Sequence, residues 1–250
     1  MANFLFKKSY QLNSLKPVPY DDLWGKKGVF TTIRVLGKKP KLILIKDHLK
    51  RINLSLKRIK IDFRLSYLMI TKLLNPILIN NSYHNGLLRI AISRNKITIS
   101  LRSRLKYSKS FSGIIYSYQR SNPDLKNLYY KKINKLLNSI DQKKQEVILS
   151  KKGLILEGCT TNLIFVSKNI IYIPIRNYYR GITMKYLLNK TSKKIRKTNI
   201  SLQNLDKFEE ILLLGSGKGV ARLLSIREIN WKSKSNLGYK EFQNLYKKVL

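Results

Sequence analysis

A single carboxylate stands between two apolar runs in the segment LILEGCTTNLIFV, Leu154–Val166. Glu157 ends the first run, Gly-Cys-Thr-Thr-Asn follows, and the chain then becomes apolar again. Short apolar runs of this kind are typical of buried strands. Since a buried carboxylate is costly unless a cation neutralises it, the segment predicts a cation beside Glu157. The protonated nitrogen of a pyridine ring is one candidate for that cation.

Two glycine-containing turns are candidates for binding an anion. The turn GSGKG, Gly215–Gly219, is not a P-loop, because Leu212 stands where the first Gly belongs and no Ser or Thr follows the lysine. It is either a turn that presents backbone N–H groups to an anion or an ordinary turn. In YYRGITMKYLL, Gly181 precedes a predicted helix start near Ile182 and Thr183, where free N–H groups suit a phosphate. A capped helix without a ligand is the alternative there.

Other common catalytic chemistries find little support. The two histidines, His48 and His84, are too few and too far apart for a metal site, and the single cysteine, Cys159, argues against zinc. His48 stands near a predicted helix start, where a structural role is more common than a catalytic one. The Gly-x-Ser-x-Gly motif of serine hydrolases is absent from the sequence. We therefore expect no bound metal.

Length and composition indicate a folded protein inside the cell. The 250 residues, 43% of them hydrophobic, allow one large or two small domains. No apolar run reaches the roughly 20 residues that span a bilayer, and the N-terminal sequence lacks the features of a secretory signal. One cysteine excludes an internal disulfide framework and suits a reducing compartment, so we expect a cytoplasmic protein.

The net charge of +38 has two interpretations. A polyanion-binding protein, such as a nucleic-acid-binding protein, is one. The other is compositional drift on solvated surfaces, because Lys and Arg are spread along the chain and Lys, Asn and Ile are abundant together. Under the second interpretation the charge still attracts small anionic substrates and binds nucleic acid weakly, without specificity, at low salt.

The pattern of predicted elements is α+β, with a polar, proline-containing linker at residues 119–127. We expect an N-terminal α/β domain over residues 1–118 and a second domain over residues 128–250. Predicted strands are Gly28–Leu36, Lys41–Ile45, Leu87–Ser93, Lys96–Leu101, Ile114–Tyr118, Glu146–Leu149, Leu154–Leu156, Asn162–Val166, Ile170–Ile173 and Glu209–Leu214. Predicted helices are Asp47–Ile59 with Asp47 as N-cap, Ser66–Leu74 ending before Pro76, Tyr130–Ile140, and one that begins near Thr183.

Five segments, in this order, resemble motifs of the class IV aminotransferases, the fold-type IV pyridoxal-phosphate enzymes. They are GVFTTIRV, DHLKRINLSLKRI, EVILSKKGLILEGCTTNLIFV, GITMKYLL and LGSGKGV. The family includes branched-chain and D-amino acid aminotransferases and 4-amino-4-deoxychorismate lyase. The resemblance implies a small N-terminal α/β domain, a larger β-rich C-terminal domain that binds pyridoxal 5'-phosphate, and a homodimer.

The resemblance also implies the residues that bind the cofactor. Glu157 would pair with the pyridine nitrogen, and Arg51 would bind the phosphate. The remaining expected cofactor-binding residues are Lys126, Tyr130, Asn162, Ile182, Thr183, Ser216 and Gly217. Met184 stands where the family has an Arg, and Lys27 stands where it has an Asp before Gly28.

The lysine that would hold the cofactor covalently has two candidates. The family places it at the start of the second domain, and the proline-containing context and the spacing to Glu157 favour Lys126. Tyr129 or Tyr130 would then lie near the cofactor's phenolic oxygen. A competing alignment of KKINKLL favours Lys131, because a common Asn-Arg pair of the family then falls on Asn134 and Lys135.

The opening strand favours one reaction of the family. FTTIRV resembles the deoxychorismate lyases, whereas branched-chain enzymes usually carry Phe-Glu-Gly there. The resemblance implies elimination of pyruvate from 4-amino-4-deoxychorismate to leave 4-aminobenzoate, with Lys126 as the base and Thr32 near the substrate. Arg34 and Arg89 are the candidates for binding the substrate carboxylates. An aminotransferase acting on small amino acids is the alternative, and a basic nucleic-acid-binding protein without catalysis is a third possibility.

Overall fold

The chain forms two compact units. A computed structural model describes residues 3–78 and 84–250. Unit 1 contains Met1–Leu105 and Leu125–Lys131, and unit 2 contains Lys106–Asp124 and Lys132–Leu250. The architecture is mixed α+β with one sheet in each unit, as the sequence predicts.

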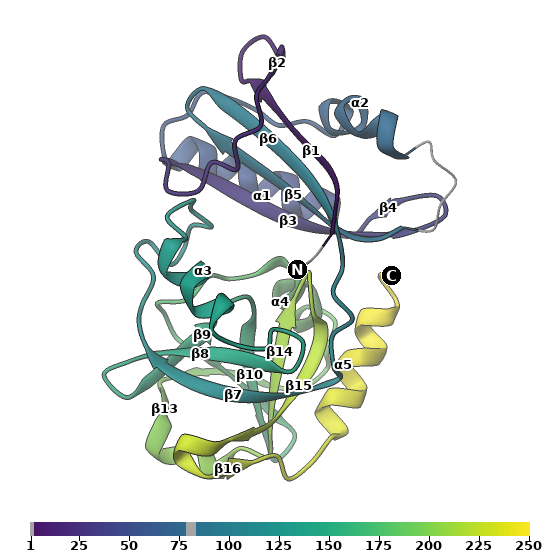
Figure 1. The fold of residues 1–250 in the computed structure, drawn as a ribbon. Coiled ribbons are helices and arrows are strands. Elements are labelled where there is room, and N and C mark those ends of the chain that lie inside the picture. The colour runs from purple at the N-terminus through teal and green to yellow at the C-terminus, as the bar shows by residue number, and fades with distance from the viewer. Residues whose placement is uncertain (1–2, 79–83) are drawn as a thin grey trace. The chain divides into compact units, whose positions relative to one another are not determined.

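Unit 1 is an antiparallel sheet in the order β2-β1-β6-β5-β3-β4 with two helices (Figure 1). Its strands are β1 (Phe4–Gln11), β2 (Pro17–Val18), β3 (Gly28–Gly37), β4 (Lys41–Leu42), β5 (His84–Ser93) and β6 (Lys96–Ser103). Its helices are α1 (Ile45–Arg58) and α2 (Tyr67–Leu78).

The two faces of this sheet differ because side chains alternate along a strand. On β3, Val29, Ile33 and Val35 point into the hydrophobic core, which also contains Ile52 and Leu56 of α1. The opposite face carries Thr32 and Arg34 of β3 and Arg89 of β5, since Thr32 lies directly across from Arg89. The helices thus pack on the apolar face, while the other face carries the polar and basic residues Thr32, Arg34 and Arg89.

Unit 2 is built on a sheet in the order β12-β11-β10-β14-β15-β7-β8-β9-β13, with β16 paired to β15. Its strands are β7 (Ser110–Ser117), β8 (Gln145–Lys151), β9 (Leu154–Gly158), β10 (Asn162–Ser167), β11 (Ile170–Pro174), β12 (Ile195–Thr198), β13 (Ile200–Ser201), β14 (Glu210–Gly215), β15 (Gly219–Ile226) and β16 (Trp231–Lys232). Its helices are α3 (Lys131–Asn138), α4 (Ile182–Leu188) and α5 (Leu237–Lys247), with short 3-10 helices η1 (Leu202–Lys207) and η2 (Arg227–Ile229). Lys131, the first residue of α3, groups with unit 1.

The two edges of the second sheet meet through one residue. Strand β12 pairs with β11 at one edge, β13 pairs with β9 at the other, and only Asn199 separates β12 from β13. The sheet therefore curls toward a closed barrel, with one core that includes Phe111, Phe165 and Phe208. A second core lies under α4 and α5, where Leu187 and Phe242 are fully buried.

Most predicted elements are confirmed, with two corrections at helix ends. Helix α1 begins at Ile45 rather than after Asp47, because strand β4 stops at Leu42 and Leu44 is the N-cap. Asp47 lies in the first turn, where a carboxylate favours the helix dipole. Helix α2 runs through Pro76 to Leu78, so the predicted end of this helix before Pro76 is wrong.

The boundary between the domains also differs from the expectation of 1–118, 119–127 and 128–250. Strand β7 pairs in parallel with β8 and β15, so residues 106–118 belong to the second unit. Residues 125–131 belong to the first unit, because Asn127 bridges to Val29 of β3. The sequence pattern does not predict strands β1 and β15 or helix α5.

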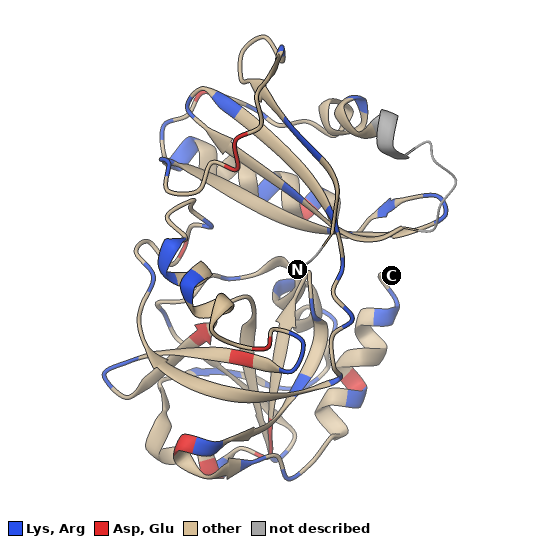
Figure 2. Cartoon of the chain, viewed as in Figure 1, with Lys and Arg blue, Asp and Glu red and all other residues tan. Residues whose placement is uncertain are grey.

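Lys and Arg residues are spread over the elements of both units rather than gathered on one (Figure 2). Within residues 3–78 and 84–250, no helix combines the length and the apolar character that crossing a bilayer requires.

Candidate active site

The buried carboxylate of Glu157 meets a cation supplied by the linker. Glu157 lies near the end of β9 and is 3% exposed. Its Oε1 is 3.0 Å from Nε of Arg120, and its Oε2 accepts a hydrogen bond from the backbone N–H of Tyr179 at 3.2 Å. The Arg120 guanidinium also donates to the carbonyl oxygens of Cys159 (2.6 Å) and Gly158 (3.3 Å). The cation that the sequence requires beside Glu157 is therefore Arg120 in this structure.

Asn162 fixes the turn that leads into helix α4. Its side-chain amide nitrogen donates to the carbonyl oxygen of Tyr179, and its Oδ1 accepts from the N–H of Gly181 at 2.9 Å. A Cβ on Gly181 would collide with that same Oδ1, so the close approach requires glycine. Gly181 is the N-cap of α4, and it has no side chain to occupy the N–H groups of Ile182 and Thr183. The turn thus keeps donors available at the helix start.

The turn at residues 215–219 joins β14 to β15 and leaves Ser216 and Gly217 half-buried. The next residue, Lys218, turns inward and is 7% exposed. Its Nζ lies 3.1 Å from Oε2 of Glu146, a fully buried residue of β8. Ser216 and Gly217 are therefore partly exposed, whereas Lys218 is buried and pairs with Glu146.

Cys159 follows the β9 strand directly and is fully buried. Burial, followed by the negative charge of Glu146, raises the pKa of its thiol to about 12. Because the thiolate is the nucleophilic form of cysteine, Cys159 is not a nucleophile at neutral pH.

In unit 1, the segment that contains both candidate lysines runs along the edge of β3. The N–H of Phe30 donates to the carbonyl oxygen of Lys126 at 2.9 Å, and the N–H of Leu128 donates to the carbonyl oxygen of Gly28 at 3.1 Å. The Lys126 ammonium lies 5.0 Å from the centre of the Phe30 ring, and its side chain is half-buried. Lys131 opens helix α3 and is exposed.

An aromatic cluster flanks this segment. Trp24 stacks on Tyr130 with ring centres 5.1 Å apart, and Phe30 meets both rings edge-on. Tyr129, the other tyrosine of the motif, is 54% exposed. Arg89 places its guanidinium carbon 3.7 Å from the centre of the Trp24 ring. Tyr130 is thus packed against aromatic rings, whereas Tyr129 points to solvent.

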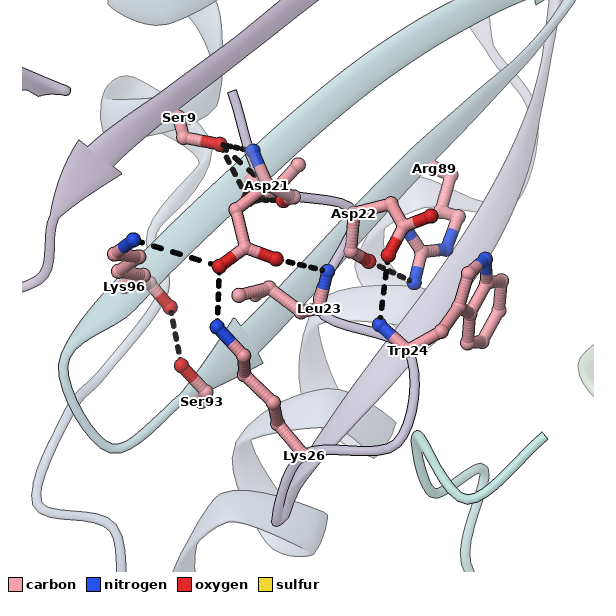
Figure 3. Close-up of polar contacts among 10 residues, drawn as sticks. Ser9, Asp21, Asp22, Leu23, Trp24, Lys26, Arg89, Ser93 and Lys96 are labelled. Carbon is pink, nitrogen blue, oxygen red and sulfur yellow. Dashed lines mark hydrogen bonds and ion pairs between the residues drawn. The ribbon is translucent and has the colours of Figure 1, made fainter. Parts of the chain in front are cut away.

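The loop that carries Trp24 is held by two aspartates (Figure 3). Asp21 accepts the N–H of Leu23 at 2.9 Å and pairs with Lys26, and Asp22 accepts the N–H of Trp24 at 3.0 Å. The carbonyl oxygen of Asp22 accepts a hydrogen bond from Arg89 at 2.9 Å. Burial is the main reason why the pKa of Arg89 falls to about 10, which still leaves it charged at neutral pH.

The neighbouring threonines of β3 face opposite sides of the sheet. Thr32 lies on the polar face with Arg34 and Arg89, whereas Thr31 points to the helix side, where its Oγ1 is 2.7 Å from Nδ1 of His48. Burial, with the charge of Lys126 second, lowers the pKa of His48 to about 3, so its imidazole is neutral. Arg51 lies one helical turn beyond His48 on α1 and is half-buried.

The structure thus gathers the expected residues in two sets. In unit 2, Glu157 and Asn162 accept hydrogen bonds from the N–H groups of Tyr179 and Gly181, just before helix α4. The same unit contains the turn of Ser216 and Gly217. Unit 1 holds Thr32, Arg34, Arg51, Arg89, Lys126 and Tyr130 on or beside β3, β5 and α1. The sequence reasoning missed Arg120, the Glu146–Lys218 pair and the Thr31–His48 contact. The sequence predicts that Glu157 needs a cation, but it does not identify Arg120, which stands 37 positions earlier in the chain, as that cation.

Comparisons with known proteins show which family and fold this chain resembles. The sequence pattern of the family described as "Amino-transferase class IV" matches residues 28–226. A branched-chain amino acid aminotransferase from Escherichia coli has a TM-score of 0.77 at 15% identity, over 95% of this chain and 92% of its own. A PLP-bound hypothetical aminotransferase from Mycobacterium tuberculosis has a TM-score of 0.76 at 16% identity, over 98% of both chains.

A third solved structure is a provisionally named 4-amino-4-deoxychorismate lyase from Legionella pneumophila. Its TM-score is 0.74 at 19% identity, over 89% of this chain and 91% of its own. No curated protein matches the sequence. At these identities the structural likeness shows a shared fold.

Proposed function

Because the chain belongs to the class IV aminotransferase family, we propose that it is a pyridoxal-phosphate-dependent lyase. Its substrate would be 4-amino-4-deoxychorismate and its products 4-aminobenzoate and pyruvate, as in folate synthesis. The observation that carries the cofactor part of the proposal is the buried carboxylate of Glu157, held at the end of β9 beside the α4 start.

The residues present suit pyridoxal 5'-phosphate. A buried carboxylate is the acceptor that a protonated ring nitrogen needs, and the carboxylate of Glu157 is buried beside the guanidinium of Arg120. The uncapped N–H groups of Ile182 and Thr183, and the accessible turn of Ser216 and Gly217, are donors suited to a phosphate. Arg51 would add a positive charge at the phosphate, as the family resemblance implies.

The bound cofactor would supply an electron sink for a carbanion at the substrate Cα. Glu157 would hold the proton on the ring nitrogen, and Arg120 would keep Glu157 ionised and oriented. The amine of the covalent lysine, once released, would take the proton from the substrate Cα at its Nζ. Thr32, directly across from Arg89, would lie near the substrate.

The substrate side of the proposal rests on the basic face of the unit 1 sheet. Arg34 and Arg89 lie on that face, and both are half-buried. 4-Amino-4-deoxychorismate carries two carboxylates, and arginine binds carboxylates in a bidentate fashion. The net charge of +38 adds a long-range attraction for such an anion.

Lys126 is our choice for the covalent lysine, and Lys131 is the competing residue. The backbone of Lys126 is fixed against β3, and its amine is half-buried over Phe30, so this side chain is already held beside the strand that carries Thr32. The case for Lys131, an exposed residue at the start of α3, is the competing alignment of KKINKLL.

Borohydride reduction followed by peptide mapping separates the two lysines. The yellow colour of the protein with bound cofactor should bleach on reduction, and the phosphopyridoxyl group should appear on the peptide that contains Lys126. Lys126→Ala should then abolish the colour while Lys131→Ala keeps it. Recovery of the label on Lys131 would overturn our choice, and a protein that never gains colour would overturn the cofactor.

The reaction itself is tested without an added keto acid. Purified protein mixed with 4-amino-4-deoxychorismate should release pyruvate and 4-aminobenzoate in equal amounts. If amino acid and keto acid are both required and only amino groups are exchanged, the enzyme is a transaminase. That second candidate, an aminotransferase for branched-chain or other small amino acids, is favoured by the fold likeness to the Escherichia coli enzyme.

The cellular setting is also part of the proposal. A homodimer is what the family resemblance implies, and the single buried cysteine suits a reducing compartment such as the cytoplasm. Analytical ultracentrifugation should give twice the mass of one chain. Nucleic acid should bind only weakly and lose binding as salt is raised.

A further inference from the structure

One buried carboxylate links two loops of unit 2. Glu146 is 0% exposed, and its Oε2 accepts from Thr161 Oγ1 at 2.9 Å and from Thr160 Oγ1 at 3.1 Å. Both threonines belong to the connection between β9 and β10. The same oxygen meets Nζ of Lys218 at 3.1 Å, and Lys218 belongs to the turn between β14 and β15.

The ammonium of Lys218 is fully engaged in this link. Besides Glu146, it donates to Thr160 Oγ1 at 3.0 Å. It also lies over the rings of Tyr107 and Phe111, with 5.3 and 5.1 Å to their centres. Its side chain is 4% exposed. Lys218 therefore points away from any ligand that approaches the outside of the turn.

The two loops approach each other closely at this link. A Cβ on Gly215 would lie 3.0 Å from the carbonyl oxygen of Thr160, which is tighter than ordinary contact. The β9–β10 connection begins directly after the strand that carries Glu157. The ion pair therefore connects the turn that carries Ser216 and Gly217 to the loop that follows Glu157.

A buried ion pair of this kind is a poor source of net stability, because both charges lose their hydration. Its effect is on geometry, since it tolerates few alternative arrangements of the two loops. We infer that Lys218 and Glu146 are positioning residues, which hold the Ser216–Gly217 turn in the shape that binds the phosphate of the cofactor. Lys218 is not itself a phosphate ligand. The inference rests on the proposed function, because the cofactor phosphate is assigned to this turn there.

The test compares two ligands that differ only in the phosphate. Dissociation constants for pyridoxal 5'-phosphate and for pyridoxal are measured by equilibrium dialysis, and their ratio gives the phosphate preference. The variants are Lys218→Met, Glu146→Gln and the double variant, which leaves no uncompensated charge in the core. The matched control is Lys151→Met, because Lys151 is an exposed lysine of β8.

Each single variant and the double variant should lose about tenfold of the phosphate preference, as expected when a charge-assisted hydrogen bond to phosphate is weakened. Pyridoxal binding should stay near the wild-type value, and Lys151→Met should keep the full preference. Circular dichroism shows which variants fold, and the double variant supplies the answer if a single variant does not fold.

Two results would overturn the inference. If Glu146→Gln increases the phosphate preference, Lys218 is a phosphate ligand that Glu146 restrains. If the folded double variant keeps the wild-type preference, the pair does not position the turn. Wild-type protein that binds neither ligand would instead overturn the proposed function, and the inference with it.

Discussion

Arg120→Met should destabilise the protein most strongly when no cofactor is bound. The substitution removes the ion pair to the carboxylate of Glu157, which is 3% exposed and keeps its hydrogen bond from the N–H of Tyr179. It also removes the hydrogen bonds to the carbonyl oxygens of Gly158 and Cys159. With cofactor bound, the protonated ring nitrogen would neutralise Glu157 in place of Arg120, so the loss should shrink.

The magnitude follows from the burial of the pair. Removing one partner of a buried ion pair costs about 3–5 kcal/mol. For chains of this size, 1 kcal/mol corresponds to about 2–4 °C in the melting temperature, so the cofactor-free variant should melt roughly 6–20 °C below wild type. The penalty arises because the carboxylate of Glu157 stays buried after its cation is removed.

Differential scanning calorimetry of both forms checks this expectation. Arg176→Met is the matched control, because Arg176 is an exposed arginine of the same unit. The double variant Arg120→Met with Glu157→Gln should recover part of the lost stability, because it removes the unpaired charge. If the cofactor-free Arg120→Met protein melts with wild type at neutral pH, Arg120 is not the cation that neutralises Glu157.

Four further outcomes are expected. Glu157→Gln should keep bound cofactor and lose most turnover, and near wild-type rates would mean that Glu157 does not set the protonation of the ring. The pKa of His48 is depressed from 6.5 to about 3, so the unfolded chain alone takes up this proton in acid. Between pH 6.5 and about pH 3, His48 should therefore lower the free energy of unfolding by about 1.4 kcal/mol per pH unit. Urea titrations of His48→Gln should lack this contribution to the slope. Cys159, with a pKa near 12, should react with iodoacetamide only after unfolding, and rapid labelling of native protein would contradict its burial. Gly181→Ala should weaken cofactor binding in equilibrium dialysis, since its Cβ would displace the Asn162 amide.

The sequence is most informative where one physical signal dominates. Apolar strands bounded by turn residues, such as Gly28–Leu36 and Asn162–Val166, reappear as β3 and β10 within a residue or two. The strand that ends near Glu157 is also confirmed, since β9 spans Leu154–Gly158. These elements depend on local pattern and burial, which can be read along the chain.

Features that depend on tertiary context are not predictable in this way. Strand β1 carries Lys7, Lys8 and Ser9 in its interior, and its pairing with β6 rather than its own pattern makes it a strand. The closure of the second sheet at Asn199 depends on strands of four and two residues. Arg120 lies in a polar segment that carries no periodic pattern, so only the three-dimensional structure identifies its partner.

The few acidic residues of this chain explain how a net charge of +38 is compatible with a defined site. The sequence has 13 acidic residues against 51 basic ones. Three glutamates are nevertheless buried, and each has its own partners. Glu157 meets Arg120, Glu146 meets Lys218, and Glu210 accepts the N–H groups of Gly238 and Tyr239 at the start of α5, both at 2.8 Å.

An exposed carboxylate contributes little to stability, because water and salt screen it. Loss of surface acids therefore changes the charge of the chain without changing the fold. A buried carboxylate differs, since removing it leaves a buried cation or two N–H donors unpaired. The number of surface charges can consequently change without loss of the fold. Glu146 and Glu157, both buried and paired with Lys218 and Arg120, keep the geometry at the end of β9.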